Sequence, residues 1–270
     1  MSWWGKLIGG AFGFMLGGPL GAVLGAALGH QFDRGLSLAD MSGGMGGDVF
    51  GGVGNRERVQ TAFFTALFSV MGHVAKADGR VTEDEIVMAR HLMQQMALGE
   101  AQRRLAIELF NKGKQADFDL ESVIQQFRQE CHRRRTLMQM FMETLLHAAY
   151  ADNVLDPAEE RLLEHISAML GFSRMFYQQM HARVQAQRYF HTGGEARSPE
   201  KQLQEAYEML GIRADASDAE IKKTYRRLMN QHHPDKLVSK GLPEEMIKLA
   251  TEKTQKIKAA YETIKKARKT

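Results

Sequence analysis

The stretch that decides the fold lies near the end of the chain, at residues 217–236, SDAEIKKTYRRLMNQHHPDK. Ser217 and Glu220 have capping-box spacing, in which each side chain accepts a hydrogen bond from a backbone N–H that a helix start leaves unpaired. Pro234 disfavours helical geometry at His233, so the helix should end there and place residues 233–235 on a loop. Between these ends, apolar residues recur at helical spacing and predict one buried face: Ile221, Tyr225, Leu228 and Met229.

Helical patterns flank this stretch on both sides. Residues 202–210 predict a short helix that ends at Gly211. Downstream, Pro243 suits the first position of a longer helix. Its apolar seam repeats at steps of three and four, which is typical of a helix packed along a partner. The seam comprises Ile247, Ala250, Thr254, Ile257, Tyr261 and Ile264. We therefore expect a hairpin of two helices joined through residues 233–235.

Three sequence blocks in residues 202–270, AYEMLGI, the stretch quoted above and IKAAYETI, resemble those of the J-domain family. Thr254 departs from the Phe usual at that seam position, and residues 237–242 lack the usual Asn-Pro. The resemblance implies that this region stimulates ATP hydrolysis by a DnaK-type chaperone. It implies that the trigger is His233, Pro234 and Asp235, and that the chaperone docks on the basic face formed by Lys222, Tyr225, Arg226 and Arg227.

Simpler interpretations of these residues exist. A single His-Pro-Asp tripeptide usually marks a turn, and a basic stripe on a helix is usually a solvated face. His232, His233 and Asp235 can suggest a metal site, but nothing nearby in the sequence completes one. Residues 197–270 carry a net charge of +6 in a chain of +4, which also suits nucleic acid or anionic lipid. No nucleic-acid motif or aromatic platform accompanies the charge, so we predict a protein partner and no nucleic acid.

An uncharged run at residues 7–29 is long enough to cross a bilayer as a helix. Glycine recurs at every fourth position from Gly5 to Gly29 and forms a stripe that lets a second membrane helix approach closely. We predict a transmembrane helix over residues 7–30 after a short external segment 1–6. Its lipid-facing side should include Leu20, Val23 and Leu24. Dimerisation is expected through Gly9, Gly13, Gly17, Gly21 and Gly25.

Three other interpretations of this run are a cleaved signal peptide, a weak span and a disordered tail. The flanking charges do not fix an orientation. Because a DnaK-type partner needs ATP, the implied placement is a single-pass protein of the bacterial inner membrane with a periplasmic amino terminus and most of the chain in the cytoplasm. A single cysteine, Cys131, is compatible with a reducing compartment.

The middle of the chain follows a Gly-rich tether at residues 31–56 and has a helical pattern over residues 57–190. A weak repeat, AKADGRVTEDEI from Ala75 and AYADNVLDPAEE from Ala149, resembles the TerB-like fold. Thr82 and Asp156 are candidate helix caps. Four acidic residues of these turns can also be viewed as a cation site: Asp78, Glu85, Asp152 and Glu159. The turns lack the alternating ligands of an EF-hand loop, so we favour the caps and predict no metal.

Residues 191–201 form a polar linker. No P-loop, dinucleotide-binding or HExxH motif occurs, and Cys131 and His132 are adjacent on a helix, so their side chains point apart. The sequence predicts no enzyme active site and no cofactor.

Taken together, the sequence predicts an all-α chain with a glycine-zipper membrane helix, a TerB-like helical bundle and a J-domain hairpin. This order resembles membrane-anchored DnaJ-like co-chaperones, which implies that the chain directs a DnaK-type chaperone to membrane-proximal clients. Two alternatives are a metal- or oxyanion-stress protein that acts through the acidic turns, and a membrane scaffold assembled by the glycine stripe.

Overall fold

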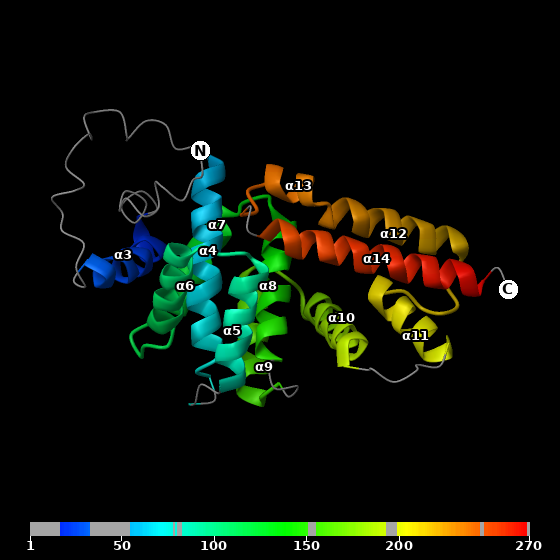
Figure 1. The fold of residues 1–270 in the computed structure, drawn as a ribbon, viewed down its shortest axis with the longest axis horizontal. Coiled ribbons are helices and arrows are strands. Elements are labelled where there is room, and N and C mark those ends of the chain that lie inside the picture. The colour runs from blue at the N-terminus through cyan, green and yellow to red at the C-terminus, as the bar shows by residue number, and fades with distance from the viewer. Residues whose placement is uncertain are drawn as a thin grey trace.

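The computed structural model describes residues 17–32, 55–77, 79, 83–150, 155–192, 199–243 and 246–268. Every regular element in these ranges is a helix, which confirms the all-α expectation (Figure 1). The helices before the J-domain region are α3 (Gly18–Phe32), α4 (Asn55–Val74), α5 (Glu83–Gln95), α6 (Glu100–Gly113), α7 (Leu120–Glu130), α8 (Arg135–Ala149), α9 (Pro157–Met169) and α10 (Arg174–Thr192). Those within it are α11 (Pro199–Leu210), α12 (Asp218–His232), α13 (Pro234–Ser239) and α14 (Ile247–Ala267).

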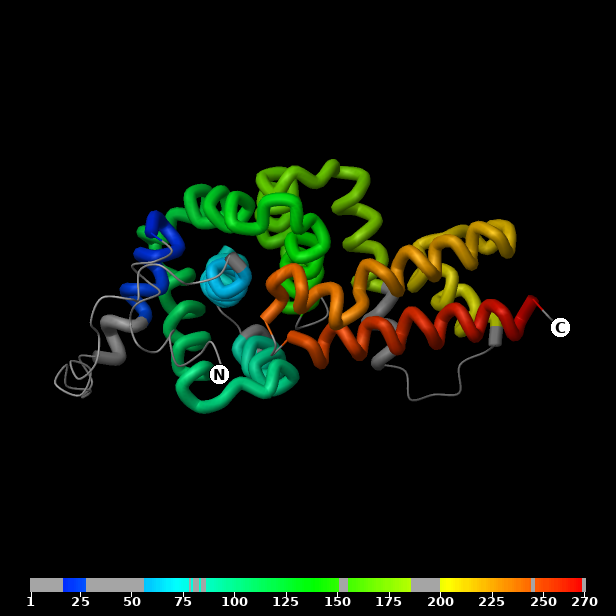
Figure 2. Tube along the Cα trace, turned by 90° about the horizontal axis from the view of Figure 1, so that it is seen from above, coloured from blue at the N-terminus to red at the C-terminus, as the bar shows by residue number. Residues whose placement is uncertain are grey.

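Helix α4 forms the centre of the middle bundle. From Val59 to Gly72 the helix is buried on all sides, and Phe63, Phe64 and Phe68 are fully buried. Figure 2 shows α4 end-on, with α6, α7 and α8 arranged around it. The Phe63 ring meets the edges of the Phe127 and Phe141 rings at centroid distances of 5.9 and 6.1 Å. These aromatic contacts join α4 to α7 and α8.

Glycines allow α4 and α6 to cross almost backbone to backbone. A Cβ atom on Gly72 would lie 2.0 Å from the Phe110 carbonyl oxygen, and one on Gly113 would lie 1.8 Å from the Ser69 carbonyl oxygen. No side chain fits at either position. The two glycines therefore set the distance between the helices that form the core of the bundle.

The second of the two repeated turns behaves as its sequence predicts. Asp156 caps α9 by accepting a hydrogen bond from the Ala158 N–H at 2.7 Å, and the Asp156 N–H donates to Glu159 at 3.2 Å. Pro157 occupies the first turn of the helix. The capping role expected of Asp156 is thus confirmed, whereas the cap expected at Thr82 lies outside the described residues.

Helix α3 covers one end of the bundle and packs on α6 and α7. The Gln126 side chain accepts from the Leu20 N–H at 2.8 Å and donates to the Gly17 carbonyl at 2.9 Å. Gly17 and Gly18 have φ angles of +56° and +58°, in the left-handed region that glycine tolerates, and the right-handed turns of α3 follow them. The start predicted at residue 7 lies outside the described residues, as do Gly9 and Gly13.

The environment of α3 differs from the one expected. Leu20, Val23 and Leu24 were predicted to face lipid, but they are buried in the main core because α6 and α7 present an apolar surface to them. Gly21 is buried as well, whereas Gly17 and Gly25 remain exposed. Within the described ranges, no helix has both the length and the apolar character needed to cross a membrane.

The J-domain region is the expected hairpin of α12 and α14, with α11 packed across α14. Ser217 and Glu220 form the predicted capping box at the start of α12. Thr254 is buried in the seam, and its hydroxyl donates to the Thr251 carbonyl at 2.8 Å, which satisfies the polar atom. One boundary was wrong: α14 begins at Ile247 rather than at Pro243, because the Met246 N–H closes a turn onto the Pro243 carbonyl.

Candidate functional site

The tripeptide His233-Pro234-Asp235 lies at the junction of α12 and α13. His233 leaves the helix with φ −60° and ψ 123°, as Pro234 requires of its predecessor. The expectation of an open loop was wrong, because Pro234 and Asp235 form the first turn of α13 and only His233 is non-helical. Proline is favoured at that first helical position, since its missing N–H costs nothing there.

The side chains of the tripeptide are accessible and oriented. The Asp235 N–H donates to the Nδ1 atom of His233 at 3.3 Å, so His233 itself caps α13. With Nδ1 accepting, the ring proton of the neutral imidazole resides on Nε2 and is available to a partner. The His233 side chain is 47% exposed and that of Asp235 is 89% exposed. Two capped helices thus hold an exposed donor and an exposed carboxylate in a fixed relation.

The residues predicted to dock a chaperone fall into two groups on α12. Lys222 and Arg226 are exposed, and the Tyr225 ring between them stacks on Tyr261 of α14 at a centroid distance of 4.2 Å. These three form one continuous row, here named the basic row. Arg227 is also exposed but lies on the opposite flank, where it lines a shallow pocket. That pocket also includes Arg213, Asp215, Glu220 and Lys223.

The base of the hairpin is docked on the middle bundle, which the sequence did not predict. Leu237, Leu242 and Met246 are buried in the same apolar core as the bundle helices. Gln60 of α4 donates to the Leu242 carbonyl at 3.2 Å. Gly241 approaches Val59 so closely that a Cβ atom would lie 2.9 Å from a Val59 methyl group. The sequence does contain a signal for this docking: apolar residues follow the tripeptide but do not belong to the seam between the two hairpin helices.

A buried charged cluster also joins the two domains. Lys253 of α14 forms an ion pair with Glu143 of α8, and Gln139 donates to the same carboxylate at 3.1 Å. Burial opposes ionisation of Glu143, but the charge and hydrogen bond of Lys253, together with other nearby basic groups such as Arg183, outweigh it and lower the pKa of Glu143 to about 2. Burial lowers the pKa of Lys253, and Glu143 offsets that effect only in part. Each partner thus stabilises the charged form of the other.

His232, next to the tripeptide, belongs to this buried cluster. It is fully buried, and neither ring nitrogen has a hydrogen-bond partner among the residues that the structure describes. Burial, reinforced by the charge of Lys253, lowers the pKa of His232 to about 3, so the ring is neutral. Among the described residues no group of three His, Cys, Asp or Glu side chains can hold a metal ion. The two adjacent histidines thus have separate environments, one buried and one exposed.

Comparison with known proteins gives three matches along the chain. Family models described as "Co-chaperone DjlA transmembrane domain", "Tellurite resistance protein TerB" and "DnaJ domain" match residues 1–39, 64–182 and 205–270. The chain is 44% identical to the "Co-chaperone protein DjlA" of Photobacterium profundum, over 97% of this chain and 98% of that protein. It is 43% identical to the protein of the same name from Vibrio cholerae, with 98% of both chains covered.

The chain belongs to the DjlA co-chaperone family. The three family models match, from the amino terminus onward, a membrane-anchoring segment, the TerB-like bundle and the J-domain hairpin. No solved structure matches the chain. Membership of the DjlA family confirms the co-chaperone interpretation and does not favour the stress-protein alternative.

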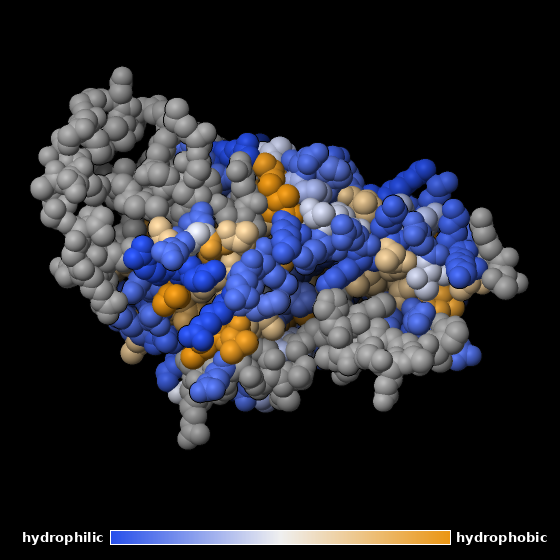
Figure 3. Space-filling model, viewed as in Figure 1, coloured by the Kyte–Doolittle hydropathy of each residue, from blue (hydrophilic) through white to orange (hydrophobic). Residues whose placement is uncertain are grey.

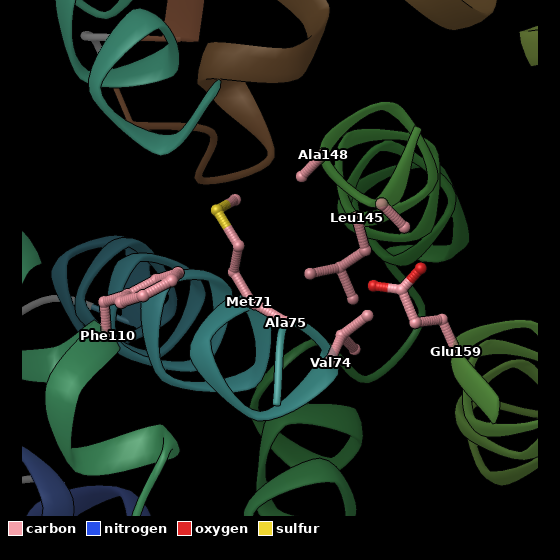
Figure 4. Close-up of a pocket in the computed structure, with 8 residues that line it drawn as sticks. Met71, Val74, Ala75, Phe110, Leu145, Ala148 and Glu159 are labelled. Carbon is pink, nitrogen blue, oxygen red and sulfur yellow. The ribbon is translucent and has the colours of Figure 1, made fainter. Parts of the chain in front are cut away.

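The acidic turns contain one described carboxylate that bears on the cation hypothesis. Figure 4 shows Glu159 beside Val74 and Leu145 at a small pocket of about 10 Å³, which has room for little more than one water molecule. Glu159 is buried and serves the capping box of α9. Asp78 and Asp152 lie outside the described residues, and Glu85 lies in the first turn of α5. The described part of the turns therefore has a structural role.

Proposed function

We propose that the chain stimulates ATP hydrolysis by a DnaK-type chaperone through His233, Pro234 and Asp235. The observation that carries this proposal is the exposed tripeptide held between two capped helices, directly beside the basic row. A row of cations on a rigid helix favours a partner with an acidic surface and increases the rate of encounter. The tripeptide would then contact the bound chaperone beside the docking surface.

The test is single-turnover ATP hydrolysis by the cognate chaperone with the full-length protein in nanodiscs. Asp235→Asn should abolish stimulation, because the amide cannot accept the charge-assisted hydrogen bonds of a carboxylate. Asp215→Asn is the matched control, since Asp215 is also exposed but lies in the α11–α12 loop. Equal stimulation by the wild type and the Asp235→Asn variant would contradict the role of the tripeptide.

The docking surface is tested by charge removal. Arg226→Ala should weaken binding to the chaperone about threefold to tenfold, with the larger loss at low salt because solvent-exposed charges are screened. Lys265→Ala, which removes an exposed charge at the far end of α14, is the control. A larger effect from Lys265→Ala would place the docking surface elsewhere.

For the membrane segment we propose a single span with a periplasmic amino terminus, dimerised through the glycine stripe, which requires α3 to leave the surface of α6 and α7 on which it packs here. The matching transmembrane family model supports an anchor, and Gly17 and Gly25 have open space where a Cβ atom would stand. In a membrane two-hybrid assay, Gly25→Leu should reduce self-association, because it blocks the close approach of a second helix. Ala26→Leu, at the neighbouring exposed position, should not. Equal self-association of the Gly25→Leu and Ala26→Leu variants would argue against dimerisation through the glycine stripe.

A further inference from the structure

A cleft of about 310 Å³ lies where the bundle and the J domain meet. Its walls come from α5, α8 and α14, so both domains contribute to it. Residues that line it include Met88, His91, Met140, His147, Leu249 and Lys256. The volume is within the range of binding sites for ligands, which occur preferentially at domain interfaces. Figure 3 shows apolar atoms reaching the surface over α5, beside a band of polar atoms.

The floor of the cleft is apolar and adaptable. Leu92 and Met140 are buried, and Met88 and Leu249 are half-buried. Methionine side chains are flexible and polarizable, so they fit apolar groups of varied shape. Two of the four floor residues are methionines. The floor therefore suits an apolar side chain without demanding one particular shape.

One cation at the cleft makes no direct ion pair with the described residues, although Glu252, one turn earlier on α14, also lines the cleft. Lys253 pairs with Glu143, but Lys256, one turn later on α14, makes no ion pair or hydrogen bond with the described part of the chain. Lys256 is half-buried, and burial lowers its pKa despite the opposing charge of Glu252. A partly desolvated ammonium group is stabilised by an incoming carboxylate. An apolar floor beside a half-buried cation that lacks a direct ion pair is complementary to an apolar group next to an acid.

We propose that this cleft binds a peptide segment of a client protein that carries an apolar side chain next to a carboxylate. This inference rests on the proposed co-chaperone function, which supplies the class of ligand. A groove between helices is a recurrent site for peptides that insert apolar anchors. Because α14 forms one wall, the bound segment contacts the J domain and the bundle together. The bundle thereby presents the client at a fixed distance from the tripeptide.

The test uses full-length protein in nanodiscs and three fluorescein-labelled octapeptides. Each has one leucine and one phenylalanine in a serine background, and they differ in one central residue: glutamate, glutamine or lysine. Affinities are measured by fluorescence anisotropy. The glutamate peptide should bind about tenfold more tightly than the glutamine peptide, and the lysine peptide should bind most weakly. Lys256→Gln should remove this preference. Lys258→Gln, which changes an exposed lysine of the same helix, should keep it.

A second pair of variants tests the apolar floor. Met88→Trp fills the cleft and should weaken binding of the glutamate and glutamine peptides at least tenfold. Val87→Trp changes the adjacent residue, which is 57% exposed and absent from the cleft lining, and should bind as the wild type does. Equal affinity of the wild type for the three peptides, or normal binding by Met88→Trp, would overturn the proposal.

Chaperone ATPase stimulation, measured without peptide on the same samples, separates the two proposals. Lys256→Gln should stimulate as the wild type does, because Lys256 lies outside the basic row and the tripeptide. Peptide preference without ATPase stimulation would refute the trigger and retain the cleft. Stimulation without peptide preference would retain the trigger and refute the cleft.

Discussion

At the residue scale, the pair His232 and His233 shows how neighbouring side chains of one type diverge. His233 caps α13 and is exposed, whereas His232 is fully buried and has no hydrogen-bond partner in the described part of the chain. The local pattern of the sequence predicted the exposure of His233 and the end of α12, because proline disfavours helical geometry at the residue before it, but it did not predict the cap of α13. It did not predict the burial of His232 either, since that burial depends on α8 and α10, which are distant in sequence. The charges that face it come from Glu143, Arg183 and Lys253.

The burial of His232 predicts an acid-labile fold. The pKa of His232 is about 3 in the folded state and about 6.5 in the unfolded state. At pH values between these two, the unfolded chain binds one proton more than the folded chain. Stability is therefore complete above pH 6.5 and falls as the pH decreases, by about 1.4 kcal/mol per pH unit between 6.5 and 5. Urea denaturation at pH 7.5, 6.0 and 5.0 measures this.

The control for this prediction is a change in an exposed histidine. His232→Leu should lose most of the pH dependence in this window, whereas His132→Gln, at an exposed position of the α7–α8 turn, should retain it. Glu143 does not confuse the result, because its carboxylate stays ionised in both states above pH 5. An unchanged slope in His232→Leu would assign the acid sensitivity to other groups.

At the element scale, the crossing of α4 and α6 is the tightest joint in the molecule's described part. A methyl group at Gly113 has no room beside the Ser69 carbonyl, so Gly113→Ala should destabilise the fold by about 1–3 kcal/mol through backbone displacement. Thermal unfolding measures the change. Gly99→Ala is the matched control, since a Cβ atom there meets only the Gln102 side chain at 3.6 Å. Equal melting temperatures for the two variants would contradict the close crossing.

Elements were predictable where their determinants are local. The cap at Ser217, the end of α12 before Pro234 and the cap at Asp156 follow from short motifs. The helix α13 and the later start of α14 were missed, because the apolar residues after the tripeptide are organised by the bundle rather than by the hairpin. The glycines of α4 and α6 were also not interpretable, since a sequence does not reveal which helices cross.

At the scale of the whole molecule, the two domains are joined by a buried ion pair. Lys253→Met should destabilise the fold by about 3 kcal/mol, because it leaves the Glu143 carboxylate buried without its partner. Combining it with Glu143→Leu should recover most of that loss, since an apolar pair replaces the ionic one. Lys248→Met, at an exposed position of α14, is the control. If the losses in free energy of unfolding from the two single changes simply add in the double variant, Lys253 and Glu143 are not energetically coupled.

The order of domains and the tripeptide were recognisable from the sequence, whereas their mutual placement was not. Contact between the hairpin and the bundle depends on residues such as Gln60 and Leu242, which are 182 positions apart. Each looks unremarkable within its own segment. The fold and the position of the tripeptide were therefore accessible from motifs, but the interface and the cleft that it forms were not.

The docked base of the hairpin has a directional consequence. Helix α14 has 21 residues and starts inside the common core, so at 1.5 Å per residue it projects about 30 Å from a fixed origin. A chaperone seated on α12 would be held at one angle to the bundle instead of rotating about a flexible joint. Every encounter would then present the same side of that chaperone to the bundle and to whatever the bundle carries.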